Sequence, residues 1–320
     1  MKKATLFLTV AALLLLASCN VDSEHGIYYQ VATSQPSSGY NIIQFIHNDG
    51  TNLYFLADNG ICYTTETKGD TKYVEGAKDL NIRGAYFDGT DFYYSRRVDN
   101  TSEIYKLTTS TGESEKIPYG KDKLDVSFNG FVYNSDGFYT AGSDSFTDLS
   151  ISNPRFSGDS MLTMDGTTKA KIYDNGTHTT PEVTGLKANA TGFIEGIDGN
   201  YYYIFDGKNI YSLSLSGSLG DAYYSDLDSA PTRGYTAVEY YEGSELRLLV
   251  RTAKGFTKIN STDGAKGTLI EKIVQFLSTL NDVVVIDMVP FGPGKVAIVT
   301  YANGIYIADM INETLSKDIL

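Results

Sequence analysis

The chain has 320 residues, a length that normally suggests two domains, and its 39 acidic and 26 basic residues give a formal net charge of −13. An acidic chain without a block of basic residues argues against binding to nucleic acid and against electrostatic attraction to anionic lipid.

The first residues of the chain have the pattern of a secretory signal. Lys2 and Lys3 precede an apolar run over 6–16, and small residues follow it. A charged start, a short apolar stretch and small residues before a cleavage point are typical of a leader that is removed. The run is far shorter than the ~20 residues needed to cross a bilayer. We therefore predict a signal peptide over 1–18.

The residues at the predicted cleavage point resemble the lipobox of bacterial lipoproteins. They read Leu16-Ala17-Ser18-Cys19. The resemblance implies that the Cys19 thiol carries fatty-acyl chains such as palmitate and becomes the new N-terminus. Stable anchoring takes two chains and the family's cysteine carries three, so a permanent membrane anchor is implied. The alternative is an ordinary cleaved signal followed by a chance cysteine.

The resemblance also suggests where the protein is held. It implies a bacterial cell envelope, and Asn20, where some lipoproteins have Asp, favours the outer membrane over the inner one. Residues 19–25 would then form a short lipidated tether. Cys62 is the only other cysteine, so an acylated Cys19 would leave it without a disulfide partner. Its strand-like surroundings predict a small buried apolar residue rather than a reactive thiol.

A repeat runs through the rest of the chain. A tight turn followed by an aromatic strand recurs six times, with its turn glycine at Gly50, Gly89, Gly137, Gly199, Gly243 and Gly292. Asp-Gly between two apolar runs is a strong hairpin signal, because glycine accepts the positive φ of tight turns. A second apolar strand motif follows each copy, starting at 61, 104, 172, 210, 256 and 305. The third copy is longer than the others. A period of about 40–50 residues with short strands predicts four-stranded propeller blades.

One copy of the repeat carries a family resemblance. Phe92-Tyr-Tyr-Ser, Ile104-Tyr-Lys-Leu and the segment 111–117 look like a blade of the tyrosine-rich β-propellers of secreted and lipid-anchored bacterial proteins. Similarity of this kind covers most of 40–320. The chain has no Trp, which argues against WD40, Asp-box sialidase and tryptophan-docking quinoprotein propellers.

These patterns predict an all-β propeller over 26–320. Six repeats favour six blades, with seven as the alternative. An isolated strand motif over 26–31 is expected to join the last blade and close the ring, because an added strand removes an exposed sheet edge.

Two segments interrupt the repeat. The first, 142–165, is rich in Ser, Asp and Gly and is predicted to be an inserted loop, either a solvated excursion or a lip that contacts a partner through Pro154, Arg155 and Phe156. The second, 268–280, has apolar residues at helical spacing and a capping box from Thr268 to Glu271. We predict a short helix packed against the ring, with a membrane-surface role as the rival.

Tyrosine is the exceptional component, with 25 Tyr. We expect one ring of each Tyr-Tyr pair to face a blade interface and the other to face outward. Ordinary propeller packing explains such rings, and a partner-binding surface is the alternative, since Tyr is enriched at interfaces.

The chain offers little sign of chemistry. It contains no H-E-x-x-H, C-x-x-C, EF-hand, P-loop or G-x-S-x-G motif. We therefore predict no catalytic residue, no cofactor and no metal. The favoured hypothesis is an envelope lipoprotein whose propeller binds or scaffolds a protein partner. The alternatives are a propeller hydrolase or lyase acting on a glycan or lactone at the axial mouth, and a sugar- or peptide-binding protein for uptake.

Overall fold

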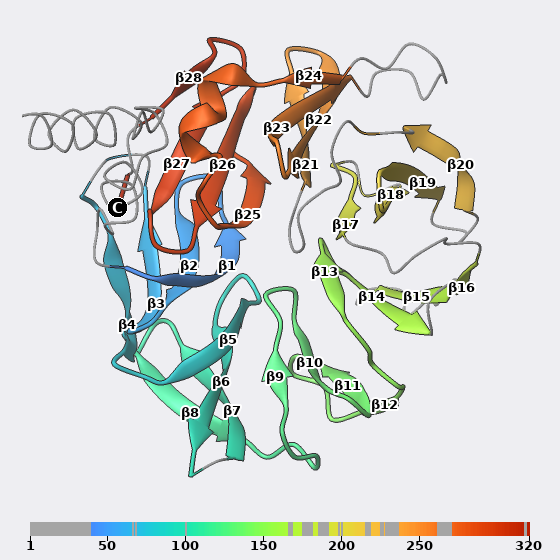
Figure 1. The fold of residues 1–320 in the computed structure, drawn as a ribbon. Coiled ribbons are helices and arrows are strands. Elements are labelled where there is room, and N and C mark those ends of the chain that lie inside the picture. The colour runs from blue at the N-terminus through green and yellow to red at the C-terminus, as the bar shows by residue number, and fades with distance from the viewer. Residues whose placement is uncertain are drawn as a thin grey trace, which may run out of the picture.

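Seven four-stranded antiparallel sheets stand as blades around a central axis (Figure 1). In every sheet, strands that follow one another in the chain pair in that order. The computed structural model describes residues 40–65, 67, 69–99, 101–165, 169–174, 182–184, 192–197, 199, 201–214, 219–224, 227, 237–260, 271–316 and 319–320. The predicted all-β propeller is confirmed.

The blades follow one another along the chain. Blade 1 consists of β1 (Ile42–Asn48), β2 (Leu53–Ala57), β3 (Gly60–Thr64) and β4 (Lys72–Lys78). Blade 2 consists of β5 (Ile82–Phe87), β6 (Phe92–Val98), β7 (Thr101–Thr108) and β8 (Glu113–Ile117). Blade 3 consists of β9 (Asp125–Val126), β10 (Phe131–Asn134), β11 (Gly137–Thr140) and β12 (Thr147–Asp148). Blade 4 consists of β13 (Arg155–Ser157), β14 (Ser160–Asp165), β15 (Lys169–Asp174) and β16 (Glu182–Thr184).

The other three blades repeat this plan. Blade 5 consists of β17 (Gly192–Glu195), β18 (Tyr201–Asp206), β19 (Asn209–Ser214) and β20 (Leu219–Tyr224). Blade 6 consists of β21 (Ala237–Glu242), β22 (Glu245–Thr252), β23 (Gly255–Asn260) and β24 (Glu271–Ile273). Blade 7 consists of β25 (Val285–Pro290), β26 (Lys295–Thr300), β27 (Ile305–Asp309) and β28 (Thr314–Leu315). The first strand of each blade lies innermost, and most of these strands contact the first strand of the next blade.

The core is divided among the blade interfaces. Seven clusters of buried apolar side chains each join two neighbouring blades, so every interface of the ring has one. Successive residues of a strand point to opposite faces of its sheet, and in a blade both faces are covered by neighbours. This is why the strands are apolar on both faces.

The same geometry corrects the expectation for the Tyr-Tyr pairs. Tyr202 packs between blades 4 and 5, and Tyr203 packs between blades 5 and 6. Both are buried, as are Tyr93 and Tyr94. The outward-facing ring that we expected is therefore wrong for these pairs, because a blade has no free face to present it on.

The blade count is seven rather than the favoured six. The long third repeat merges two blades: the turn at Gly137 joins β10 to β11 in blade 3, whereas the strand motif beginning at 172 belongs to β15 in blade 4. The inner turn of blade 4 is Gly158-Asp159, with φ +52° at Gly158. It reverses the order of the Asp-Gly signal, so it does not match the repeated Asp-Gly pattern.

The segment 142–165, predicted to be an inserted loop, instead forms strands of the ring. This segment contains β12 and then β13 and β14, which are the outermost strand of blade 3 and the two inner strands of blade 4. Short strands rich in Ser, Asp and Gly carry a weak periodic signal, so pairing with neighbours rather than local composition makes them strands.

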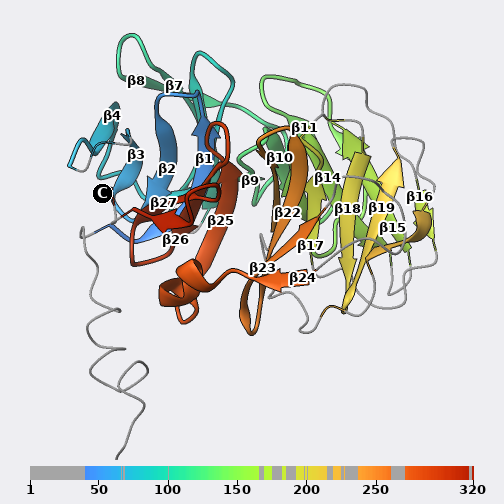
Figure 2. The same ribbon diagram turned by 90° about the horizontal axis from the view of Figure 1, so that it is seen from above.

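Within 271–280, the described part of the helix predicted over 268–280, only the last six residues are helical. Residues 275–280 make a 3-10 helix, η1 (Gln275–Leu280), whose Leu277 and Leu280 are buried against blades 6 and 7. Residues 271–273 instead form β24, because Ile273 pairs with Thr257 of β23. Thr268 lies outside the described residues. Figure 2 shows η1 beside β23 and β24 at one side of the ring.

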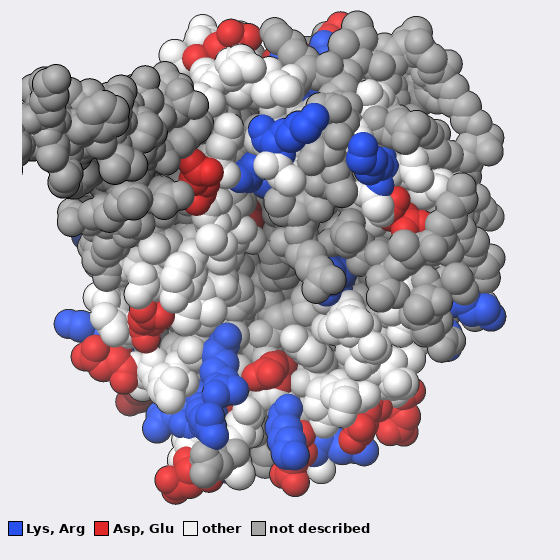
Figure 3. Space-filling model, viewed as in Figure 1, with Lys and Arg blue, Asp and Glu red and all other residues white. Residues whose placement is uncertain are grey.

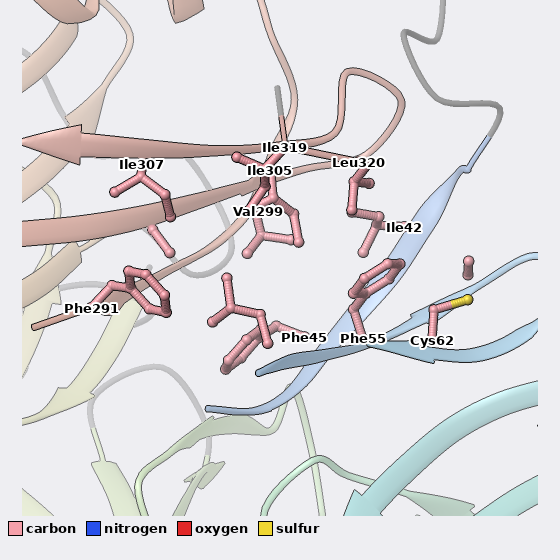
Figure 4. Close-up of a cluster of buried hydrophobic side chains, with 13 residues drawn as sticks. Ile42, Phe45, Phe55, Cys62, Phe291, Val299, Ile305, Ile307, Ile319 and Leu320 are labelled. Atoms are coloured by element: carbon pink, nitrogen blue, oxygen red, sulfur yellow. The ribbon is translucent and has the colours of Figure 1, made fainter. Parts of the chain in front are cut away.

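Blades 1 and 7 close the ring through their inner strands and through the last two residues of the chain. The Ile42 N–H donates to the Tyr301 carbonyl at 2.7 Å. The Ile319 N–H donates to the Ile305 carbonyl at 3.0 Å, and the Gly69 N–H donates to the Ile319 carbonyl at 3.2 Å. Ile319 and Leu320 thereby lie in the apolar cluster between the two blades (Figure 4). The expected closing strand over 26–31 lies outside the described residues.

The two cysteines differ in whether the structure describes them. Cys62 is fully buried between blades 7 and 1, and burial raises the pKa of its thiol to about 12. Its prediction as a small buried apolar residue is confirmed. The leader over 1–18 and Cys19 lie outside the described residues. Within the part of the chain that the structure describes, no helix is long and apolar enough to cross a membrane.

Candidate functional site: the axial cavity

A cavity of about 360 Å³ lies at the axis of the ring. Side chains of blades 1, 3, 4, 5, 6 and 7 meet there, most of them from the innermost strands β1, β13, β17, β21 and β25. Its lining consists of Phe45, Phe128, Phe156–Gly158, Ile194–Ile197, Gly199, Ala237–Glu239 and Asp287–Pro290. The volume lies within the ~300–1,000 Å³ usual for ligand pockets.

Apolar side chains form most of the wall. Phe45, Phe128 and Phe156 come from three different blades, and Phe128 meets Phe156 edge to face with ring centroids 6.4 Å apart. Ile197 lies at the rim, where 37% of it is exposed. No Lys, Arg or His lines the cavity among the described residues.

Glu239 is a carboxylate held in this wall by three hydrogen-bond donors. It lies on β21 and is only 3% exposed. Its oxygens accept from the Tyr201 hydroxyl at 2.7 and 2.8 Å and from the Tyr203 hydroxyl at 2.8 Å. The Ile197 N–H donates to Oε2 at 2.9 Å. All of these donors belong to blade 5, so Glu239 joins blade 5 to blade 6.

Glu195 makes a similar connection one blade earlier. Its Oε2 accepts from the Asp159 N–H at 3.1 Å, and its own N–H donates to the Ser157 hydroxyl at 2.8 Å. The carboxylate on the inner strand of one blade thus binds the inner turn of the preceding blade. Glu195 and Glu239 occupy equivalent places on β17 and β21. The same carboxylate contact between neighbouring blades therefore occurs twice in the ring.

Asp287 differs from both. It lies on β25, is 8% exposed, and accepts one hydrogen bond, from the N–H of the adjacent Met288 at 2.8 Å. Burial raises the pKa of this carboxyl to about 7, and the Met288 N–H only partly opposes that shift. Buried carboxylates normally have a cationic partner or several donors. Asp287 has neither among the described residues.

Amide side chains make further contacts between the inner strands. The Gln44 side chain donates to the Ala85 carbonyl at 3.1 Å and accepts from the Ala85 N–H at 2.9 Å, which joins blades 1 and 2. The Asn129 side chain donates to the Ser160 carbonyl at 2.9 Å, which joins blades 3 and 4. These contacts hold the inner strands, and so the cavity wall, in place.

The structure brings only one of the proposed contact residues to the cavity. Phe156 is buried between blades 3 and 4 and lines it. Pro154 precedes β13, and the Arg155 guanidinium donates to the carbonyls of Asn153 and Pro154. Within the described ranges, no group of three or more His, Cys, Asp or Glu side chains could hold a metal ion.

The carboxylates of the cavity were not identified from the sequence. Each follows apolar residues within an inner strand, as in Gly-Phe-Ile-Glu195, Ala-Val-Glu239 and Val-Ile-Asp287. An acidic residue directly after apolar residues of an inner strand was the available signal. Figure 3 shows that charged side chains on the viewed face lie mostly toward the rim, where acidic and basic residues are interspersed.

Comparison with known proteins supports the fold alone. No family model matches the chain, and no curated protein matches it. The solved structure of YCF48 bound to D1 peptide is similar over 85% of this chain and 93% of that chain, with a TM-score of 0.55 and 13% identity. The crystal structure of Kluyvelomyces marxianus Hsv2 is similar over 87% and 97%, with a TM-score of 0.56 and 11% identity. The chain is a β-propeller. At these identities the likeness extends to architecture and no further.

Proposed function

We propose that this chain is a lipid-anchored protein of the bacterial cell envelope, held in the outer membrane through Cys19, whose propeller binds a protein partner at the axial cavity. The observation that carries the binding role is the cavity itself: six blades contribute to it, its wall is mainly apolar, and Ile197 is exposed at its rim. Concave apolar sites with a few placed polar groups are the usual form of a binding site.

Two further observations support this function. YCF48, a structural neighbour with the same fold, is bound to a peptide in its solved structure. The anchor is supported by the sequence Leu16-Ala17-Ser18-Cys19 and would hold the ring close to the membrane, where it could scaffold a second envelope protein.

The binding role is tested by affinity capture from detergent-solubilised envelopes. Ile197→Arg changes the rim of the cavity, and because Ile197 contributes its backbone N–H to Glu239, that hydrogen bond is retained. Ile311→Arg is the matched control, since Ile311 is 55% exposed and lies outside the cavity.

We expect a stoichiometric partner with the wild-type chain and with Ile311→Arg, and loss of that partner with Ile197→Arg. Repeated recovery of the chain without a stoichiometric partner would contradict the binding role. Equal recovery by both variants would place the partner elsewhere on the ring.

A further inference from the structure

Two buried carboxylates face the axial cavity without a cation to balance them. Asp287 and Glu239 are both more than nine-tenths buried, and they lie on the adjacent inner strands β25 and β21. Their hydrogen-bond donors are backbone N–H groups and tyrosine hydroxyls. Among the described residues, neither has a Lys, Arg or His partner.

A cavity wall with these carboxylates should favour cationic ligand groups over neutral and anionic ones. Coulombic interactions are several times stronger in a partly desolvated cavity than in water. An anion entering here would be repelled, and a neutral apolar group would leave Asp287 with the Met288 N–H as its donor and no charged partner. A cation would give Asp287 the charged donor that the fold does not supply, and charge-assisted hydrogen bonds are the stronger ones. The raised pKa of Asp287 agrees with a carboxyl that lacks such a partner.

The rest of the wall suits an alkyl stem and a cationic head. Phe45, Phe128 and Phe156 contribute aromatic surface to the same cavity. Lysine and arginine bury their methylene stems against apolar surface, and their charged heads are attracted to aromatic faces. A cavity of about 360 Å³ has room for one long side chain of this kind.

We infer that the axial cavity receives a lysine or arginine side chain of the protein partner, with its stem against the phenylalanines and its head at Asp287. This inference rests on the proposed function, because it takes the ligand to be part of a protein. It adds the chemistry of recognition: the partner presents a basic residue in a segment that can enter the mouth of the ring.

The test uses the full-length chain in detergent and three blocked tripeptides, in which glycine flanks lysine, arginine or norleucine. Norleucine has the lysine stem without the charge. Ligand-observed NMR titration measures each affinity, and n-butylammonium serves as a small amine without a peptide. Asp287→Asn removes the carboxylate that is proposed to bind the cationic head and leaves Glu239 in place. Asp148→Asn is the control for net charge, because its carboxylate is 86% exposed on β12, away from the cavity.

We expect the lysine and arginine peptides to bind about tenfold more tightly than the norleucine peptide, and this preference to be lost in Asp287→Asn but kept in Asp148→Asn. Thermal melting of both variants checks that they fold. Equal binding of lysine and norleucine peptides, or a cation preference that survives Asp287→Asn, would overturn the inference. Tighter binding of n-butylammonium than of the lysine peptide would overturn a protein side chain as the ligand.

The two proposals fail in different ways. A captured partner together with no cation preference would reject this inference and retain the binding role. A cation preference without any captured partner would reject the protein-binding role and leave a cation-selective cavity.

Discussion

Asp287 shows how one residue makes the stability of the ring depend on pH. Its pKa rises from 3.8 to about 7 on folding, because the carboxyl is buried. Between these values the folded chain keeps a proton that the unfolded chain has lost, so the free energy of unfolding falls as pH rises. Above about pH 7 the folded chain bears the full cost of burying an ionised Asp287. Below pH 3.8 the carboxyl is protonated in both states, and this cost is absent.

Replacing this carboxyl should therefore stabilise the protein in a pH-dependent way. We predict that Asp287→Asn raises the free energy of unfolding at pH 8 by at most about 4 kcal/mol and has little effect at pH 4. Urea denaturation of both chains at pH 4, 6 and 8 measures the difference. A difference that does not change with pH would show that ionisation of Asp287 is not its cause.

The tyrosines around Glu239 allow a comparison between two buried hydroxyls. The Tyr203 hydroxyl donates to a carboxylate, whereas the Tyr202 hydroxyl shares a 2.7 Å hydrogen bond with the neutral Ser160 hydroxyl. We predict that Tyr203→Phe lowers the free energy of unfolding by about 1.5–3 kcal/mol and that Tyr202→Phe lowers it by about 1 kcal/mol. Chemical denaturation measures both, and the reverse order would be inconsistent with a charge-assisted contact.

At the scale of elements, Ile319 and Leu320 pack between the first and last blades and connect them. Ile319 is buried among side chains of both blades and is hydrogen-bonded to both. Truncating such a side chain leaves a cavity, so we predict that Ile319→Ala lowers the free energy of unfolding by about 2–5 kcal/mol. The control is Ile311→Ala, a change within about 0.5 kcal/mol because Ile311 is largely exposed. Equal losses of unfolding free energy in the two variants would mean that packing of Ile319 does not hold the ring closed.

The strand motif over 26–31 gives a second prediction about closure. β28 is the outermost strand of blade 7, and among the described residues it pairs only with β27. A strand added there would cover a free edge and bury further apolar side chains, each worth about 1.5–3 kcal/mol when fully buried. A chain starting at Pro36 should therefore melt at a lower temperature than one starting at Asn20. Equal melting temperatures would show that 26–31 does not contribute to ring closure, which would then depend on Ile319, Leu320 and the inner strands.

At the scale of the whole molecule, the anchor and the ring should be separable. Cys19 precedes the first described blade, so losing the acyl chains proposed for it should remove no contact within the seven blade interfaces. We predict that Cys19→Ala yields a folded protein released from the membrane, since the chains supply the binding energy. Cell fractionation together with a thermal melt measures both properties. Membrane association that still requires detergent to break would contradict the lipid anchor.

The sequence by itself determined the class of the fold and the position of the two middle strands in most blades. Tight turns such as Asp49-Gly50 and Asp88-Gly89, each followed by an aromatic strand, are local signals, and the structure places both at the inner turns of blades. Hairpins form between residues that are neighbours in the chain, so their pattern survives in the sequence. Burial of Cys62 was predicted for the same reason, from the apolar strand around it.

The tertiary structure decided the blade number, the ring closure and the cavity. The strand at Arg155–Ser157 becomes recognisable only through pairing, and Ile319 becomes a core residue only where the first and last blades meet. Glu239 and Asp287 come from different blades, and nothing in their spacing shows that they line one cavity. Burial on the axis depends on the closed ring of seven sheets, which is a property of contacts between residues far apart in the chain.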